Sequence, residues 1–151
     1  MVKVNFYDLN TIDDSKLLFA VIMTKFNGKW VYVRHKDRST WEIPGGHRED
    51  NENINDTASR ELFEETGATK FKLNPICTYS VERDKDVDYT ESFGQLFYSE
   101  VEEFNNLLCF EISEIQLFED IPSNLTYPLI QPFLHKKVLE FLKEDFYKNI
   151  Q

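Results

Sequence analysis

The sequence is poor in the residues that interrupt or cross-link a chain. Its 151 residues include five glycines, five prolines and two cysteines. There is no repeat, low-complexity tract or Gly/Ser linker, so we expect a single domain over residues 1–151. The two cysteines, Cys77 and Cys109, both have apolar neighbours. This context favours buried thiols in a reducing compartment over a disulfide.

The chain also lacks a membrane segment and a surplus of positive charge. Its longest apolar stretch, Leu17–Met23, is far shorter than the ~20 residues of a membrane-spanning helix. The start, MVKVNFYDLN, has no basic segment followed by an apolar run, so no signal peptide is expected. The net charge of −10 repels nucleic-acid backbones and anionic membranes. We therefore expect a soluble, cytoplasmic protein that binds neither a nucleic-acid polymer nor a membrane.

Apolar residues are plentiful enough for a folded core. Hydrophobic residues make up 41% of the chain and aromatic residues 15%, which excludes intrinsic disorder. Leu17–Thr24 is an apolar run of strand length, and Lys29–Arg34 alternates with a period of two. Between them, Asn27-Gly28 tolerates positive φ at both positions and predicts a tight hairpin. Trp41–Ile43 is a candidate short strand that ends at the Pro44-Gly45-Gly46 turn.

A helix is predicted after that turn. Asn55 or Asp56 is expected to cap its start and Gly67 its end, while its inward stripe consists of Ala58, Leu62 and Thr66. The remaining elements are expected as strands at Lys70–Val81, Phe93–Val101 and Ile115–Phe118, a charged loop at Glu82–Asp88, and a helix at Pro132–Lys148. Strands interleaved with two helices indicate an α/β (α+β) fold, an α/β/α sandwich around a central mixed β-sheet.

The predicted helix carries three carboxylates on one face. Glu61, Glu64 and Glu65 are spaced three and four residues apart, which brings their Cβ atoms within about 6 Å of one another. Like charges this close destabilise a helix unless a cation binds, and ligands that are all oxygens suit Mg²⁺ or Mn²⁺ better than zinc. Arg60 can pair with one of these carboxylates and orient it. Glu52 precedes the helix and can fold back toward them.

These residues follow a known spacing. From Gly46 the chain reads five residues, Glu52, seven residues, and then RELFEETGA from Arg60 to Ala68. This pattern resembles the Nudix box, G-x5-E-x7-R-E-U-x-E-E-x-G-U, where U is a bulky aliphatic residue. Every invariant position matches, and the one departure is the small Ala68. The resemblance implies the Nudix-type sandwich fold and hydrolysis of a nucleoside diphosphate linked to another moiety, with Mg²⁺ or Mn²⁺.

The resemblance also implies roles within the box. Glu64 and Glu65 match the metal ligands, joined by the carbonyl of Gly46. Glu61 is either a further ligand or the general base that deprotonates the attacking water. Arg60 orients the acids. Glu52, Gly45 and Gly67 support the geometry of the loop and helix.

Residues outside the box are candidates for the substrate. Arg34, His35, Lys36 and Arg38 form a basic cluster that contacts phosphates or is a solvated loop. Trp41 precedes E-I-P-G-G, which resembles the entry to the box in bacterial enzymes that cleave 8-oxo-dGTP. A core position is expected for Trp41 ahead of a role as a platform on which the base stacks. Asn124 resembles an asparagine that reads the purine edge in those enzymes, or it caps a loop. A general base from outside the box would be one of Glu91, Glu100, Glu102 and Glu103.

The leading hypothesis is a Nudix hydrolase that converts a nucleoside triphosphate, such as 8-oxo-dGTP, to monophosphate and pyrophosphate, which would cleanse the nucleotide pool. One alternative is hydrolysis of ADP-ribose or another nucleoside diphosphate derivative. Another is a catalytically silent nucleotide-binding module. The sequence leaves open whether the protein is a monomer or a homodimer.

Overall fold

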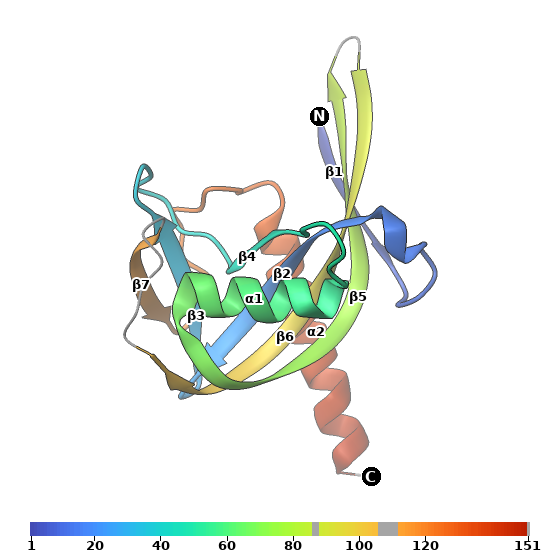
Figure 1. Cartoon of the computed structure of the whole chain (residues 1–151). Coiled ribbons are helices and arrows are strands. Elements are labelled where there is room, and N and C mark those ends of the chain that lie inside the picture. The colour runs from blue at the N-terminus through green and yellow to red at the C-terminus, as the bar shows by residue number, and fades with distance from the viewer. Residues whose placement is uncertain (86–87, 106–111, 151) are drawn as a thin grey trace.

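The computed structural model describes residues 1–85, 88–105 and 112–150 (Figure 1). The elements, in chain order, are β1 (Val2–Tyr7), a short 3-10 helix η1 (Asp14–Lys16), β2 (Leu17–Phe26), β3 (Lys29–His35), β4 (Gly45–His47), α1 (Ile54–Thr66), β5 (Ala68–Lys85), β6 (Asp88–Phe104), β7 (Ile112–Phe118) and α2 (Gln131–Asn149).

The strands form one mixed sheet in the order β1-β5-β6-β2-β3-β7, and β4 pairs with β2. The β2–β6 pairing is parallel, and the other pairings are antiparallel. Helix α1 lies across one face of this sheet and α2 across the other (Figure 1). The predicted sandwich around a central mixed sheet is therefore confirmed.

Two turns predicted from glycine are present. Asn27 and Gly28 have φ values of 49° and 77°, and they join β2 to β3, whose pairing begins at Phe26 and Lys29. A turn with two positive φ values matches the twist of the strands that it connects. Gly67 ends α1 in the left-handed region, with its N–H donated to the Phe63 carbonyl, as expected of a helix C-cap.

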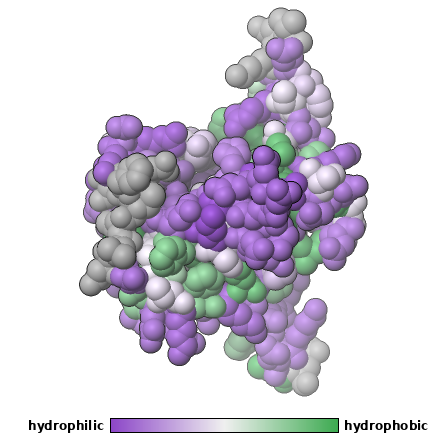
Figure 2. Space-filling view, viewed as in Figure 1, coloured by the Kyte–Doolittle hydropathy of each residue, from purple (hydrophilic) through white to green (hydrophobic). Residues whose placement is uncertain are grey.

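The start of α1 differs from the prediction. The cap is Asn53, whose side-chain oxygen accepts the N–H of Asp56, so the proposal of Asn55 or Asp56 was wrong by two or three residues. The inward stripe of Ala58, Leu62 and Thr66 is buried as predicted. The outward face of the helix is hydrophilic (Figure 2).

Several strand limits also differ. β1 was not predicted, although Val2, Val4 and Phe6 pack against the core on the α2 side. The stretch Glu82–Asp88 was predicted to be a loop, but its charged residues continue β5 as far as Lys85 and begin β6 at Asp88. The predicted strand at Trp41–Ile43 is limited to isolated bridges of Trp41 and Glu42, and the strand that follows is Gly45–His47.

The core has two parts, one on each side of the sheet. Leu17, Ile22, Phe97 and Leu62 belong to the part under α1, and the larger part, which includes Tyr32 and Leu134, lies under α2. Cys77 is a buried free thiol, and Cys109 lies outside the described residues. In the part of the chain that the structure describes, we found no helix with the length and apolar character to cross a membrane.

Candidate active site

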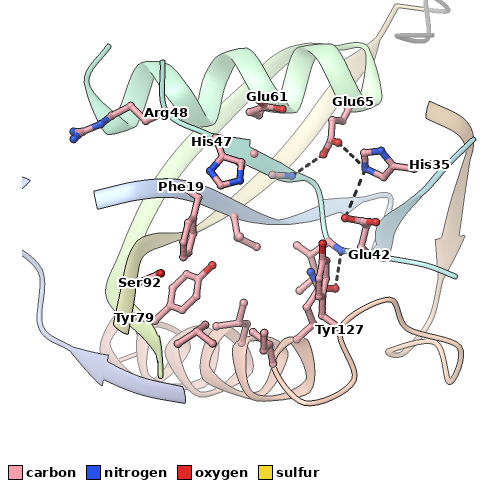
Figure 3. Close-up of a pocket in the computed structure, with 18 of the residues that line it drawn as sticks. Phe19, His35, Glu42, His47, Arg48, Glu61, Glu65, Tyr79, Ser92 and Tyr127 are labelled. Carbon is pink, nitrogen blue, oxygen red and sulfur yellow. Dashed lines mark hydrogen bonds and ion pairs between the residues drawn. The ribbon is translucent and has the colours of Figure 1, made fainter. Parts of the chain in front are cut away.

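A cleft of about 640 Å³ lies between α1 and the start of α2 (Figure 3), within the size range of small-molecule sites. One side, which we call the box wall, is made of residues 45–66, namely β4, the loop after it and α1. The opposite side, the distal wall, consists of His35, Arg38, Glu42, Ile43, Tyr127, Ile130, Gln131 and Leu134. Apolar side chains of the sheet, among them Phe19, Val21, Tyr79 and Val81, form the floor between the two walls.

Arg60 is the centre of the box wall. Its Nε lies 2.8 Å from Glu52 Oε2, and its Nη1 lies 2.8 Å from Glu61 Oε1 and 3.1 Å from Glu64 Oε2. Its Nη2 donates to the His47 carbonyl at 2.9 Å. The hydrogen bond from Arg60 holds the pKa of Glu52 down to about 2. One guanidinium therefore gathers three carboxylates and ties α1 to the loop before it.

Glu61 has the opposite electrostatic environment. Burial raises the pKa of its carboxyl to about 7, and the charges of Glu65 and Glu64 add to this rise, while Arg60 opposes it. The carboxylate lies against the backbone of Gly46, where a β-carbon would collide with it. Only glycine leaves room for this contact, so the Gly46 backbone and Glu61 share one corner of the cleft.

Glu65 is buried and held on both oxygens. Its Oε1 accepts the N–H of Gly45 at 2.7 Å, and its Oε2 lies 3.1 Å from Nε2 of His35. Figure 3 shows His35 between Glu65 and Glu42, whose Oε2 is 3.6 Å from the same nitrogen. The hydrogen bond to Glu65 raises the pKa of His35, which favours the imidazolium between two carboxylates. His35 thus joins the box wall to the distal wall.

Glu42 continues this connection along the distal wall. Its Oε1 accepts from Arg38 at 3.0 Å, and Arg38 also lies 5.8 Å from the Tyr127 ring centre. Burial raises the pKa of Glu42, although the charges of His35 and Arg38 lower it. The distal wall therefore places a partly desolvated acid and a half-exposed guanidinium at the mouth of the cleft.

Gln131 is the polar group beside the apolar floor. It is the first residue of α2 and is only 5% exposed. Its Oε1 accepts the N–H of Ile43 at 3.0 Å. Because the oxygen is fixed in this way, the Nε2 amino group is the part of the amide left to donate to a ligand in the cleft.

The structure brings some of the predicted site residues together and not others. Gly45, Gly46, Arg60, Glu61, Glu65 and Arg38 all line the cleft. Glu52 and Glu64 lie beside it through Arg60. Gly67 lies at the end of α1 and not in the cleft.

Three substrate candidates lie away from the cleft. Arg34 bonds to the Arg38 carbonyl and to Glu114. Trp41 packs edge-on against Phe118 in the core. The Asn124 amide donates to the Ser39 carbonyl at 2.9 Å, so it joins two loops.

The proposed distal acids do not line the cleft either. Glu91 accepts from Tyr7 and Ser80, and Glu100 accepts from Tyr98. Glu102 pairs with Lys70, and Glu103 lies beyond Val101 near the end of β6. The acid from outside the box that does reach the cleft is Glu42. Its position in W-E-I-P-G-G was a usable signal, whereas no local pattern marked Gln131.

The box wall has the ligand chemistry for a hard divalent cation. Glu61, Glu64, Glu65 and the Gly46 carbonyl offer only oxygen, as Mg²⁺ and Mn²⁺ prefer. Within residues 1–85, 88–105 and 112–150, no three Asp, Glu, His or Cys side chains already converge on one point. Instead, the Arg60 guanidinium stands between Glu61 and Glu64. Two of these acids therefore already bind a cationic group, and the donor set fits a divalent ion that takes the place of this guanidinium.

Comparison with known proteins agrees with this geometry. A family model described as the NUDIX domain matches residues 15–131. YtkD of Bacillus subtilis (strain 168), a proposed 8-oxo-dGTP diphosphatase, is 30% identical over 126 residues, which cover 83% of this chain and 75% of that protein.

Solved structures share the fold. The crystal structure of the Bacillus subtilis pyrophosphohydrolase BsRppH matches with a TM-score of 0.73 at 25% identity, covering 92% of this chain and 90% of that one. The NUDIX domain of Shewanella oneidensis NrtR, crystallised with ADP ribose, matches with a TM-score of 0.59 at 17% identity, covering 93% and 94%. The second likeness concerns the fold alone.

Proposed function

The chain belongs to the Nudix hydrolase family, and from this premise we propose that it cleaves the pyrophosphate linkage of a nucleoside triphosphate. The products would be a nucleoside monophosphate and pyrophosphate. The observation that carries the proposal is the pairing, in one cleft, of the oxygen-rich box wall with an apolar floor that ends at the Gln131 amide. The box wall suits a polyphosphate with its cation, and the apolar floor suits a nucleotide base.

The proposed cofactor is Mg²⁺ or Mn²⁺, held by Glu64, Glu65, the Gly46 carbonyl and, in one arrangement, Glu61. When bound, such an ion neutralises the charge on phosphate oxygens and makes water a better nucleophile. Seven of the chain's acidic residues and only two arginines lie between Gly46 and Gly67. The net charge of this segment is therefore −5, half of the −10 of the whole chain. A polyphosphate would enter this part of the cleft only together with a cation.

The chain's own residues supply the remaining steps. The attacking water must lose a proton, and Glu61, with a pKa raised to about 7, is the box carboxylate best matched to take it near neutral pH. Before the cation binds, Arg60 fixes the direction of Glu61 and Glu64. The Gly45 N–H and His35 hold Glu65, so that it enters the reaction without reorganisation.

For the base, we propose a purine, with 8-oxo-dGTP as the first substrate to test. YtkD, the Bacillus relative, supports this choice by its proposed activity. The apolar floor can pack against a ring, and the Gln131 amino group can donate to a carbonyl or ring nitrogen on its edge. Because the Asn124 amide is bonded to Ser39, the role of reading the purine edge that the sequence suggested for Asn124 passes in this proposal to Gln131.

The test is a substrate panel with Mg²⁺. It contains the four dNTPs, 8-oxo-dGTP, ADP-ribose and an RNA oligonucleotide with a 5′ triphosphate. The products are separated by chromatography, so that pyrophosphate, phosphate and, from ADP-ribose, AMP with ribose 5-phosphate are scored separately. We expect pyrophosphate from the free triphosphates, with 8-oxo-dGTP turned over fastest, and no turnover with a chelator. Preferential cleavage of ADP-ribose would overturn the triphosphate assignment, and preferential cleavage of the RNA would overturn the expectation that polymers are not substrates. No turnover of any compound would favour the silent binding module.

A further inference from the structure

A second cavity, also of about 640 Å³, lies beside the start of α1. The segment after β1 forms one side of it, and the first turn of α1 forms the other. Its lining residues are 9–14, Leu17, 53–56, Pro75, Thr78 and Gln95. None of them lines the active-site cleft, so the second cavity is a separate place on the molecule.

Its floor contains two buried polar side chains without partners. Thr78 on β5 and Gln95 on β6 lie directly opposite each other in the sheet, and they are 1% and 8% exposed. Neither side chain makes a hydrogen bond within the described part of the chain, although both face the cavity. Among the described residues, the fully buried side-chain atoms without a partner are Ser99 Oγ and His135 Nε2, so the polar atoms of Thr78 and Gln95 open onto the cavity, whereas most buried polar groups bond within the protein. Groups placed in this way are suited to a ligand that enters the cavity.

The charge of the lining selects the kind of ligand. The lining includes Asp13, Asp14 and Asp56, and none of its residues is a lysine, arginine or histidine. A helix N-terminus by itself attracts anions. Asp14 is already paired with Arg48 at 3.1 Å, but the carboxylates of Asp13 and Asp56 remain at the edge of the cavity and reverse that preference. The ligand is therefore a cation, and a nucleotide phosphate is excluded.

The lining also separates an organic cation from a metal ion. Leu9, Ile12, Leu17 and Ile54 supply aliphatic surface in the same cavity. A cation that uses both kinds of surface has an aliphatic stem and a donor-rich charged end, as a protonated amine does.

We propose that the second cavity binds a small aliphatic amine. Its ammonium group would donate to the Thr78 hydroxyl and the Gln95 amide oxygen, with the rim carboxylates supplying the counter-charge. Its methylene groups would lie against Leu17 and Ile54. This proposal does not depend on the hydrolase activity, because it uses none of the residues of the cleft.

The experiment uses the full chain without nucleotide. Putrescine and spermidine are titrated by calorimetry at low salt, and the bound site is mapped by amide chemical shifts. Butane-1,4-diol, which has the same length as putrescine without charge, and succinate, which carries the opposite charge, are the comparison probes. We expect saturable binding of the two amines alone, with shifts centred on residues 9–14 and 53–56. Equal binding of the diol or of succinate would overturn the assignment of a cation.

Three variants locate the site. Gln95→Leu removes the buried amide at similar volume and should weaken putrescine binding by ~10-fold or more, the usual cost of a lost hydrogen bond to a charged group. Asn55→Lys adds a positive charge at the exposed rim, where folding is not at risk, and should weaken binding about fivefold. Asn149→Lys makes the same change at the far end of α2 and should alter affinity by less than about twofold. If Asn55→Lys and Asn149→Lys behave alike, the amine is held by the general acidity of the surface and the proposal is wrong.

Discussion

The two walls of the active-site cleft differ in charge and are assembled in different ways. In the box wall, Arg60 reaches acids that are one, four and eight residues away. In the distal wall, Arg38 and Tyr127 are 89 residues apart, and Ile43 and Gln131 are 88 apart. The first wall needs little more than a helix and its loop, whereas the second exists only when the sheet and α2 are in place.

The walls also differ in how tightly their charges are held. The Arg60 side chain is 21% exposed and contacts several carboxylates. The Arg38 side chain is 45% exposed, and the one carboxylate with which it pairs among the described residues is Glu42. Desolvated, multiply bonded charges are geometrically fixed, and exposed ones are screened and mobile. We therefore assign the chemistry to the box wall and the selection of the base to the distal wall.

The largest expected effect comes from exchanging one acid in each wall. Glu64→Gln should lower kcat by about 10³-fold, because it removes a charged oxygen that acts on the transition state. Since Glu64 is 44% exposed, the fold should survive, which thermal unfolding would check. Glu42→Gln should cost less than about tenfold. Steady-state kinetics of both variants is the measurement. If the Glu42 variant loses as much activity as the Glu64 variant, the assignment of the chemistry to the box wall alone is wrong.

The next effect concerns stability and uses the two arginines. Arg60→Ala removes the hydrogen-bond partner shared by three carboxylates and the 3.6 Å ion pair with Glu49. It should lower the free energy of unfolding by about 2 kcal/mol, less than the loss of a fully buried charge because Arg60 keeps some solvent contact. Arg38→Ala should cost only about 0.5 kcal/mol. Urea unfolding without metal measures both. Equal losses would show that the distal wall is as tightly held as the box wall.

The contrast explains which parts the sequence predicted. The spacing of Arg60, Glu61 and Glu64 is local, so the helix geometry alone places them together, and the turn at Asn27-Gly28 is equally local. Gln131 and His35 are placed in the cleft by contacts with residues far away in the sequence. The spacing of residues along one sequence does not predict such contacts. The case of β1 is different, because the alternation of Val2, Val4 and Phe6 was visible and was missed.

A third effect tests the reading of the base by the distal wall. Gln131→Glu keeps an oxygen to accept the Ile43 N–H but removes the amino donor, so kcat/KM for a guanine or 8-oxoguanine nucleotide should fall about tenfold relative to dATP. Gln131→Leu also leaves the Ile43 N–H unpaired and should lower stability by about 1–3 kcal/mol. The ratio of kcat/KM for dGTP and dATP is the measurement, with Glu64→Gln as the variant whose ratio should not change. An unchanged ratio in Gln131→Glu would remove Gln131 from base selection.

The smallest expected effect is a pH dependence of folding stability that arises from His135 on α2, the helix that carries part of the distal wall. His135 on α2 is 4% exposed, and its Nδ1 lies 3.2 Å from the Tyr32 hydroxyl on β3. Its Nε2 has no hydrogen-bond partner among the described residues, since Asp120 is 3.6 Å away. Burial therefore lowers the pKa of His135 below its usual 6.5, despite the charge of Asp120.

The sign of the dependence follows from where the proton binds. Below pH 6.5 the unfolded chain protonates this histidine and the folded chain does not, so the stability that neutral His135 provides is complete above 6.5 and is lost as the pH falls through that value. His135→Phe abolishes the titration, and the difference in unfolding free energy between wild type and variant should shrink steadily from about pH 7.5 to 5.5. Other titrating groups are present in both proteins and cancel. A difference that grows toward low pH would mean that His135 is charged in the fold and paired with Asp120, and this ion pair would then support the distal wall.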